Sequence, residues 1–317
     1  MKASAKVFAG VSGAALAFRG FQRLVCYEIF ARDAGLLRAN MDRGGAARQE
    51  RMLKDPHVQW FNAQERQDVW RENLRGQRLH ASMIPAEGSR VYCICAHGYR
   101  SNGSRDFREQ AQFLNEMGWN ILLVDHQACG ESEGRYMSFG YYESLDLVGW
   151  CDYLNETYGS DIRIVLFGIS MGAASTLMAV GSGRLPENCD FAISDCAYAG
   201  VEELFRYHLR QYHVPAQPLL YAVDWRNAHL AGYRLGEVKP IEAVRNASIP
   251  VIFFHGERDG VVPPQMGQAL CDACKSESEL HIIAGAGHTT SYPKDCETYE
   301  AAVRAFAQKH LQTANPD

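Results

Sequence analysis

Residues 164–175 constrain the fold more than any other part of the chain, because they join a strand pattern, a sharp turn and a helix pattern. Four apolar residues, 164–167, are typical of a buried strand, and Ala173–Val180 is rich in helix formers. Between them, Gly168-Ile-Ser-Met-Gly172 matches the pattern Gly-x-Ser-x-Gly. Such a turn strains the backbone of its central residue and leaves no room for a Cβ at either glycine. The stretch therefore predicts that the hydroxyl of Ser170 lies at the carboxyl edge of a sheet, at a helix N-terminus.

Strand and helix patterns alternate on both sides of this turn. Further strands are predicted at residues 68–73, 77–84, 90–96, 120–125, 191–195, 250–256 and 279–284. Further helices are predicted at residues 107–117, 141–158, 264–275 and 298–311. Nearly continuous apolar strands are typical of a sheet covered on both faces. The alternation predicts an α/β fold with a mostly parallel, doubly wound sheet.

Two segments do not follow the alternation. Residues 196–249 are longer than a simple crossover and rich in aromatic residues and histidine, which predicts a helical cap inserted over the sheet edge. The cap aromatics are expected to line a substrate pocket, to pack a core of their own, or both. Residues 1–60 read as a helical and irregular extension, so the α/β core is predicted to comprise residues 61–195 and 250–317.

Composition excludes several classes of protein. The chain has 317 residues, a net charge of −5 and no basic stripe, so nucleic acid is not an expected partner. No metal, nucleotide or flavin signature is present, and Cys271-x-x-Cys274 has no second pair with which to hold zinc. The ten cysteines are scattered, several of them in apolar segments, which is typical of reduced thiols in the cytosol. No pattern predicts an oligomeric state.

The first thirty residues allow more than one interpretation. The apolar run Val7–Phe18 follows Lys2 and Lys6 and precedes Arg19, but it is shorter than the roughly 20 residues needed to span a bilayer. The run resembles a weak signal sequence or an amphipathic surface helix. We favour a helix that stays on the protein or touches a membrane, so residues 1–30 are the candidate membrane contact of a cytoplasmic protein.

A reactive serine needs a base and an acid that orients the base. His288 follows the last predicted strand in a glycine-rich loop, and Asp259 follows the strand before it. Serine, aspartate and histidine in this order are found in α/β-hydrolases. All three residues follow strand carboxyl ends, where open α/β sheets place their sites. Asp195 also closes a strand and is the rival acid, but its loop leads into the cap.

Two further carboxylates and an anion site complete these expectations. Glu257 is expected to face away from the site, and Asp125 to bind the backbone of the 126–134 loop. The backbone N–H groups of Met171 and Tyr99 are the candidate donors to a developing oxyanion. The candidate substrate-binding side chains are Tyr99, Tyr198 and Phe205.

Six motifs carry a resemblance to a known family. They are His97-Gly-Tyr, Asp125 with Gly130-Glu-Ser-Glu-Gly134, Gly168-Ile-Ser-Met-Gly172, Ser194-Asp-Cys-Ala-Tyr198, His255-Gly-Glu-Arg-Asp259 and Gly285-Ala-Gly-His288. Over about residues 60–312 the chain resembles bacterial α/β-hydrolases, and more narrowly esterase-like enzymes akin to the serine aminopeptidase S33 and cinnamoyl-esterase branches. One departure is the loop His126-Gln-Ala-Cys-Gly130, where such loops usually read Arg-Gly-His-Gly. The resemblance implies the fold, the triad and the oxyanion donors, and no particular substrate.

These observations predict a serine hydrolase that cleaves small carboxylic esters with apolar or aromatic acyl groups through an acyl-enzyme. A peptidase or amidase is the first alternative, with Glu202 or Glu203 as candidate ligands for a free amine; as exposed helix residues, however, they read more simply as solvated charges. A non-catalytic scaffold that binds a ligand or partner is the second alternative. Such scaffolds typically lose a triad member, and this chain has all three.

Overall fold

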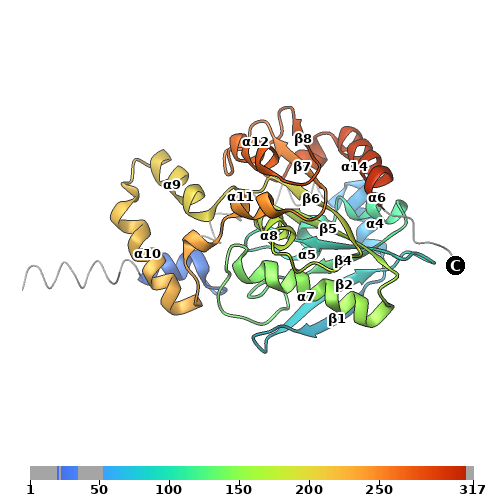
Figure 1. The fold of residues 1–317 in the computed structure, drawn as a ribbon, viewed down its shortest axis with the longest axis horizontal. Helices are drawn as coiled ribbons and strands as arrows, with labels where there is room; N and C mark the ends of the chain where they lie inside the picture. Colours follow the sequence, from blue (N-terminus) through green and yellow to red (C-terminus); the bar gives the residue numbers. More distant parts are fainter. Residues whose placement is uncertain (1–19, 21–22, 35–52, 312–317) are drawn as a thin grey trace, which may run out of the picture.

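The computed structural model describes Gly20, residues 23–34 and residues 53–311 (Figure 1). An eight-stranded sheet with the order β1-β2-β4-β3-β5-β6-β7-β8 forms its centre. The strands are β1 (Gln67–Glu72), β2 (Arg78–Ile84), β3 (Val91–Ala96), β4 (Trp119–Val124), β5 (Arg163–Ile169), β6 (Cys189–Asp195), β7 (Val251–Gly256) and β8 (Ser278–Ile283). Strand β2 is antiparallel to both β1 and β4, and the pairs from β4 to β8 are parallel. The predicted α/β class and mostly parallel sheet are confirmed.

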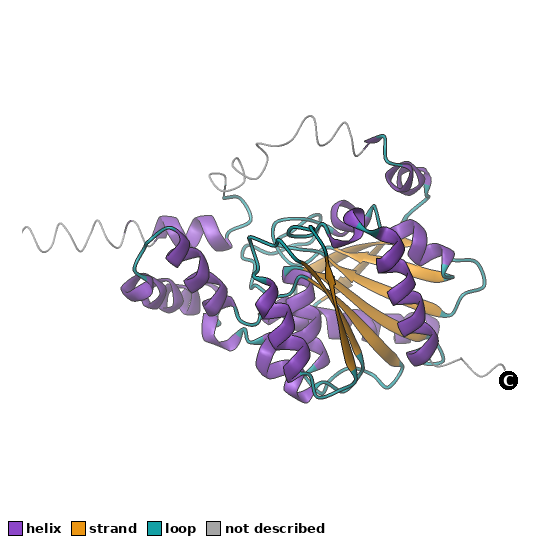
Figure 2. Ribbon diagram, turned by 90° about the horizontal axis from the view of Figure 1, so that it is seen from above, coloured by secondary structure: helices purple, strands orange, loops and turns teal. Residues whose placement is uncertain are grey.

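Helices cover both faces of the sheet (Figure 2). They are α4 (Pro56–Ala63), α5 (Gly103–Phe107), α6 (Ala111–Glu116), α7 (Tyr141–Tyr158), α8 (Met171–Val180), α12 (Pro264–Ala273), α13 (Ser291–Lys294) and α14 (Cys296–His310). The buried side chains form two large apolar clusters, one with α7, α8 and α12 and the other with α4, α6 and α14. Successive residues of a strand enter opposite clusters, as the two-residue period requires: Cys93 and Cys95 join one, Ile94 and Ala96 the other.

One predicted helix is wrong in its bounds. Residues 107–117 were expected to form a single helix, but α5 ends at Phe107 and α6 begins at Ala111. Helix α5 starts early because the side chain of Asn102 accepts the N–H of Arg105 and acts as the N-cap. The other strands and helices were predicted to within a few residues, and α7 was predicted with both ends correct.

The segment between β6 and β7, for which the sequence predicts a cap, contains helices. It contains α9 (Val201–Gln211), α10 (Ala216–Ala231) and α11 (Pro240–Ala243), with two short 3₁₀ turns, η2 (Leu235–Glu237) and η3 (Val244–Asn246). Helices α9 and α10 extend away from the sheet at one end of the molecule (Figure 1). We call them the β6–β7 helices.

Residues 23–34 pack against the α/β core. A helix covers residues 23–30, which we call the N-terminal helix, and Ala31 then forms an isolated antiparallel bridge with Tyr136. The N–H of Met137 donates to the Phe30 carbonyl at 2.9 Å. The apolar run Val7–Phe18 lies outside the described residues, and no described helix has the length and apolar character needed to cross a membrane.

A buried carboxylate on α7 makes stability depend on pH. Burial, and then the nearby Glu143, raise the pKa of Asp146 to about 7. An acid whose pKa rises on folding contributes stability that is complete below its unfolded pKa of about 4 and is lost as pH rises through 7. We expect the unfolding free energy of Asp146→Asn to equal that of wild type near pH 4. Above pH 7 it should be greater than that of wild type by roughly a few kcal/mol. Urea unfolding of both proteins across this range measures the difference.

The control is Glu156→Gln, on the exposed side of α7. Its stability relative to wild type should not change with pH in this way. A constant difference between Asp146→Asn and wild type from pH 4 to pH 8, roughly, would contradict the assignment of a raised pKa to Asp146.

Candidate active site

Ser170 lies at the turn between β5 and α8, in the conformation that the sequence pattern predicts. Its φ of 56° and ψ of −113° fall in a region that residues with a side chain rarely adopt. A Cβ at Gly168 would collide with Gly172 and Ala173, and a Cβ at Gly172 would collide with the Ala96 carbonyl. The N–H of Ser170 donates to the Asp195 carbonyl at 2.8 Å. Both glycines are therefore required by close packing around the strained serine.

Three loops at the carboxyl edge of the sheet bring together the side chains of Ser170, His288 and Asp259. The Oγ of Ser170 is 2.9 Å from Nε2 of His288. Nδ1 of His288 is 2.8 Å from Oδ2 of Asp259. Because the carboxylate accepts a hydrogen bond, Nδ1 carries a proton and Nε2 of the neutral ring is free to accept the serine proton. The predicted convergence of these three side chains is what the structure shows.

Asp259 is held as a carboxylate by several donors. Its Oδ1 accepts the N–H groups of Val261 and Val262 at 2.9 and 2.8 Å. Nε2 of His255 donates to the Val262 carbonyl at 2.9 Å and lies 3.4 Å from Oδ2 of Asp259. Burial alone would raise the pKa of Asp259, but the hydrogen bonds from His255 and His288 outweigh it and hold this pKa below its usual value.

The loop that carries His288 is attached to the loop that carries Asp259. The N–H of Arg258 donates to the Ala286 carbonyl at 2.8 Å. The carboxylate of Glu257 accepts the N–H of Gly285 at 2.8 Å. The carboxylate of Glu257 is thus bonded to the backbone of the histidine loop, whereas Nδ1 of His288 is bonded to Asp259.

Asp195, the alternative acid, is hydrogen-bonded to a different residue. Asp195 is buried, its Oδ1 accepts the hydroxyl of Ser291 at 3.0 Å, and burial raises its pKa to about 6. Nδ1 of His288 is bonded to Asp259 at 2.8 Å, whereas the hydrogen bond of Asp195 goes to Ser291. Asp259 is therefore the acid that contacts the imidazole.

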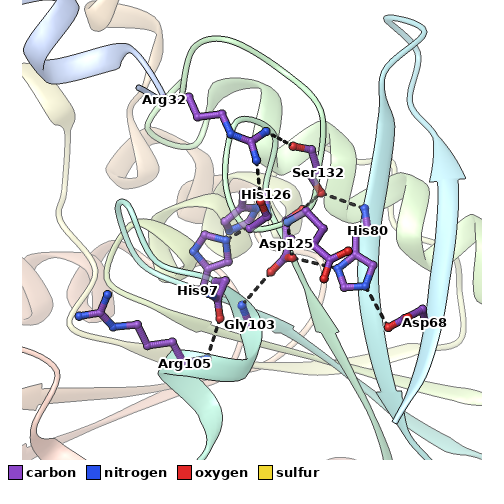
Figure 3. Close-up of polar contacts among 12 residues, drawn as sticks. Arg32, Asp68, His80, His97, Gly103, Arg105, Asp125, His126 and Ser132 are labelled. Carbon is purple, nitrogen blue, oxygen red and sulfur yellow. Dashed lines mark hydrogen bonds and ion pairs between the residues drawn. The ribbon is translucent and has the colours of Figure 1, made fainter. Parts of the chain in front are cut away.

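Asp125 has the structural role that the sequence predicts. It accepts the N–H of Glu131 at 3.0 Å, the N–H of Gly103 at 3.1 Å and Nδ1 of His80 at 2.9 Å (Figure 3). A Cβ at Gly130 would collide with this carboxylate, so the glycine lets the loop close over Asp125. The 126–134 loop is thereby fixed to β2 and to α5.

The loop after β3 runs beside Ser170. A Cβ at Gly98 would lie 3.4 Å from Cβ of Ser170. Nδ1 of His97 donates to the Gly98 carbonyl at 2.6 Å, and Nε2 accepts the N–H of His126 at 3.0 Å. Figure 3 shows the two histidines side by side. The Gly98 N–H donates to Oδ2 of Asp106 at 2.7 Å.

The hydrogen bond from His97 to the Gly98 carbonyl fixes the direction of the Tyr99 N–H. The Gly98 carbonyl and the Tyr99 N–H belong to one planar trans peptide and point in opposite directions. The Tyr99 N–H therefore points away from His97, and no acceptor for it is found within the described part of the chain. The Met171 N–H belongs to the first turn of α8, where a helix leaves its N–H groups unbonded. Both candidate oxyanion donors are thus free to bind a ligand.

The side chain of Tyr99 is bonded to the N-terminal helix. Its hydroxyl donates to the Ile29 carbonyl at 2.6 Å and accepts Nε of Arg100 at 2.8 Å. The guanidinium of Arg100 also donates to three carbonyls, those of Glu28, Ala31 and Ala34. Sequence reasoning missed Arg100, because nothing in its immediate neighbourhood points to a partner some seventy residues earlier.

An aromatic cluster surrounds Tyr99. Phe139 stacks on Tyr99 at 5.0 Å and contacts Phe30 and Phe205 edge to face at 5.5 and 5.4 Å. Tyr198 is buried, and its hydroxyl donates to the Phe139 carbonyl at 2.6 Å. Phe139 connects these residues although its φ is 52°, and no motif in the sequence singled it out. Tyr99 and Phe205 are only partly buried, whereas Tyr198 is fully buried.

One group of metal-type ligands occurs among the described residues. Donor atoms of Cys196, Asp259 and His288 lie within 4.8 Å of one another. Asp259 and His288 are already bonded to each other, and burial raises the pKa of the Cys196 thiol. The group is explained by the triad geometry and supplies no separate site.

Comparisons with known proteins show the family of this chain. The family model described as the prolyl oligopeptidase family matches residues 105–314, more than half of the chain. The uncharacterized protein YqkD of Bacillus subtilis is 32% identical over 225 residues, 71% of this chain and 73% of that protein.

Solved structures share the fold at low identity. The esterase Pf2001 of Pyrococcus furiosus aligns with a TM-score of 0.65 and 20% identity over 80% of this chain and 94% of that one. Est1E of Butyrivibrio proteoclasticus, solved with ferulic acid bound, aligns with a TM-score of 0.59 and 18% identity over 77% and 99% of the two chains. With the family match, these likenesses lead to one assignment: the chain belongs to the prolyl oligopeptidase family and is a serine hydrolase with the α/β-hydrolase fold.

Proposed function

We propose that this hydrolase cleaves carboxylic esters that carry an apolar or aromatic acyl group. Oγ of Ser170 attacks the ester carbonyl carbon while Nε2 of His288 takes the hydroxyl proton. The tetrahedral oxyanion accepts the N–H groups of Tyr99 and Met171. Collapse breaks the bond to the alcohol, which leaves with the proton from His288. Water then attacks the acyl-enzyme by the same proton transfers and releases the carboxylic acid.

The hydrogen-bonded series from Ser170 through His288 to Asp259 supports this proposal most strongly. Its two distances, 2.9 and 2.8 Å, place a base within reach of the hydroxyl before any substrate is bound. The aromatic cluster around Tyr99 and Phe205 supports an apolar acyl group. The structural neighbour Pf2001 is an esterase, and the neighbour Est1E was solved with ferulic acid, an aromatic acid, bound to it.

A peptidase or amidase is the second candidate, favoured by the family, which is named for oligopeptidases. Recognition of a free amine needs an unpaired acid near the site. Glu202 pairs with Arg206 one helical turn away, so it is not an unpaired carboxylate. A non-catalytic scaffold is the third candidate, and the intact triad argues against it.

We expect Ser170→Ala to abolish turnover of p-nitrophenyl esters, by roughly 10⁴-fold or more, because no other group can carry the acyl intermediate. The melting temperature should stay nearly unchanged, and labelling by a fluorophosphonate probe should disappear. Ser182→Ala, an exposed serine in the turn that follows α8, is the matched control. Ester turnover that survives in Ser170→Ala would reject the proposal, and p-nitroanilides cleaved faster than the matching esters would favour the peptidase.

Acyl preference follows from the aromatic cluster. We expect kcat/KM to rise from acetate through longer and aromatic p-nitrophenyl esters, since each buried apolar carbon gains free energy in the pocket. Phe205→Ala should lower kcat/KM for aromatic esters by roughly tenfold and leave acetate almost unaffected, because the acetyl group has no ring to pack against Phe205. Equal rates across the series, or an equal loss for acetate, would contradict a pocket shaped by Phe205.

Arg100 is expected to position the oxyanion amide of Tyr99 rather than touch substrate. Arg100→Ala removes its hydrogen bonds to the Tyr99 hydroxyl and to the end of the N-terminal helix. We expect kcat to fall roughly ten- to a hundredfold with a smaller change in KM, since oxyanion donors act mainly in the transition state. Arg105→Ala, an exposed arginine of α5, is the control. Loss of stability with kcat unchanged would show that Arg100 is only structural.

A further inference from the structure

A cavity of about 520 Å³ lies between strand β2, the loop after β3 and the 126–134 loop. Its volume falls within the roughly 300–1,000 Å³ that is typical of sites for small organic molecules. Ser170, Asp259 and His288 are not among the described residues that line it. The cavity is therefore separate from the triad, and the proposed reaction gives it no role.

Two arginines from distant segments line this cavity. Arg32 follows the N-terminal helix, and Arg100 follows Tyr99 in the loop after β3. The guanidinium of Arg32 donates to the Ser132 and Gly130 carbonyls at 2.5 and 2.6 Å (Figure 3). The guanidinium of Arg100 donates to the Tyr99 hydroxyl and to three backbone carbonyls. All these acceptors are uncharged, so the bonds orient both guanidinium groups without neutralising them.

Both guanidinium groups lie near Cys129. Burial raises the pKa of the Cys129 thiol, and the charges of Arg32 and Arg100 both oppose that rise. Arg100 also donates to the carbonyl of Ala31, the residue before Arg32, at 3.1 Å. Neither arginine forms an ion pair with a carboxylate within the described part of the chain. Neighbouring like charges repel, and an anion bound between them removes the repulsion.

The acids beside the cavity do not cancel this positive charge. Asp125 accepts Nδ1 of His80 and two backbone N–H groups. Burial alone would lower the pKa of His80, but its hydrogen bonds to carboxylates outweigh burial and raise this pKa, which favours a positive charge beside Asp125. Glu131 also lines the cavity, but it is exposed to solvent, whereas Glu28 and Asp33 are not among the described lining residues.

The wall next to Arg100 offers neutral donors. Oδ1 of Asn102 accepts the N–H of Arg105 at 2.8 Å, and its Nδ2 has no acceptor within the described residues. The hydroxyl of Ser104 likewise has no partner in the part of the chain that the structure describes. A ligand that carries oxygen atoms beside its anionic group can therefore bind both side chains.

We propose that this cavity binds a small organic phosphate monoester, with the phosphate group between Arg32 and Arg100. A phosphate monoester carries roughly 1.5 to 2 negative charges at pH 7, which match two guanidinium groups. Guanidinium groups bind phosphate through paired, charge-assisted hydrogen bonds. Asn102 and Ser104 are the donors to the organic part. A carboxylate has a single charge, so it should bind more weakly.

Titration calorimetry of the full chain with glycerol phosphate tests the proposal without using catalysis. We expect saturable binding of one molecule per chain, with a Kd below roughly 1 mM. Arg32→Gln should weaken this binding by roughly 10- to 100-fold, because it removes charge-assisted hydrogen bonds. Glycerate, which carries a carboxylate in place of the phosphate, should bind wild type more weakly by roughly fivefold or more.

The matched control is Arg135→Gln, an exposed arginine that does not line the cavity. It should bind glycerol phosphate as wild type does. No saturable binding by wild type up to roughly 10 mM, or an equal loss in the control, would overturn the proposal. Glycerate that binds as tightly as glycerol phosphate would overturn the choice of a phosphate.

A second variant separates binding from folding, because Arg32 also supports the 126–134 loop. Ser104→Asp breaks no hydrogen bond among the described residues and adds a negative charge to the cavity wall. It should weaken binding by roughly tenfold with the melting temperature nearly unchanged. Binding that stays unchanged in Ser104→Asp would contradict the site. Because no outcome depends on turnover, the result stands apart from the proposed function.

Discussion

The hydrogen bond between the imidazole of His288 and the carboxylate of Asp259 is the interaction on which the site depends. It fixes the ring so that Nε2 faces the hydroxyl of Ser170, 2.9 Å away. The bond forms because β5, β7 and β8 are parallel, so the loops that follow them leave the sheet at the same edge. The loop–loop contacts of Glu257 and Arg258 then hold the acid and the base at their spacing.

The N-terminal helix also holds part of this site, because it bonds the loop after β3. Tyr99 offers its backbone N–H to the site and its side-chain hydroxyl to the N-terminal helix. Arg100, itself in a left-handed conformation with φ of 56°, bonds the end of that helix. Strained residues persist only where their surroundings hold them. The loop after β3 is thus held by the end of the N-terminal helix.

Much of the site could be predicted from the sequence because its signals are local. Gly168 and Gly172 specify a sharp turn, and the triad residues each follow a recognisable strand. The distinct role of Asp125 was also predictable, since it precedes a glycine-rich loop that only a buried acceptor can organise. Fold class follows from the strand–helix alternation for the same reason.

What could not be predicted depends on contacts between distant segments. Arg100 binds carbonyls about seventy positions earlier, and Phe139 joins four segments through ring contacts that no spacing encodes. The break between α5 and α6 was missed because the cap at Asn102 competes with a helical pattern that begins later. The bond from the Tyr99 hydroxyl to the Ile29 carbonyl could not be predicted either, because its partner lies within a segment with no motif.

A crystal structure of the enzyme after reaction with a phosphonate ester tests the central claim most directly. The account predicts phosphorus bonded to Oγ of Ser170, with the phosphoryl oxygen accepting the N–H groups of Tyr99 and Met171 and with Nε2 of His288 near the leaving-group oxygen. An adduct on another residue, or a phosphoryl oxygen turned away from both amides, would contradict it.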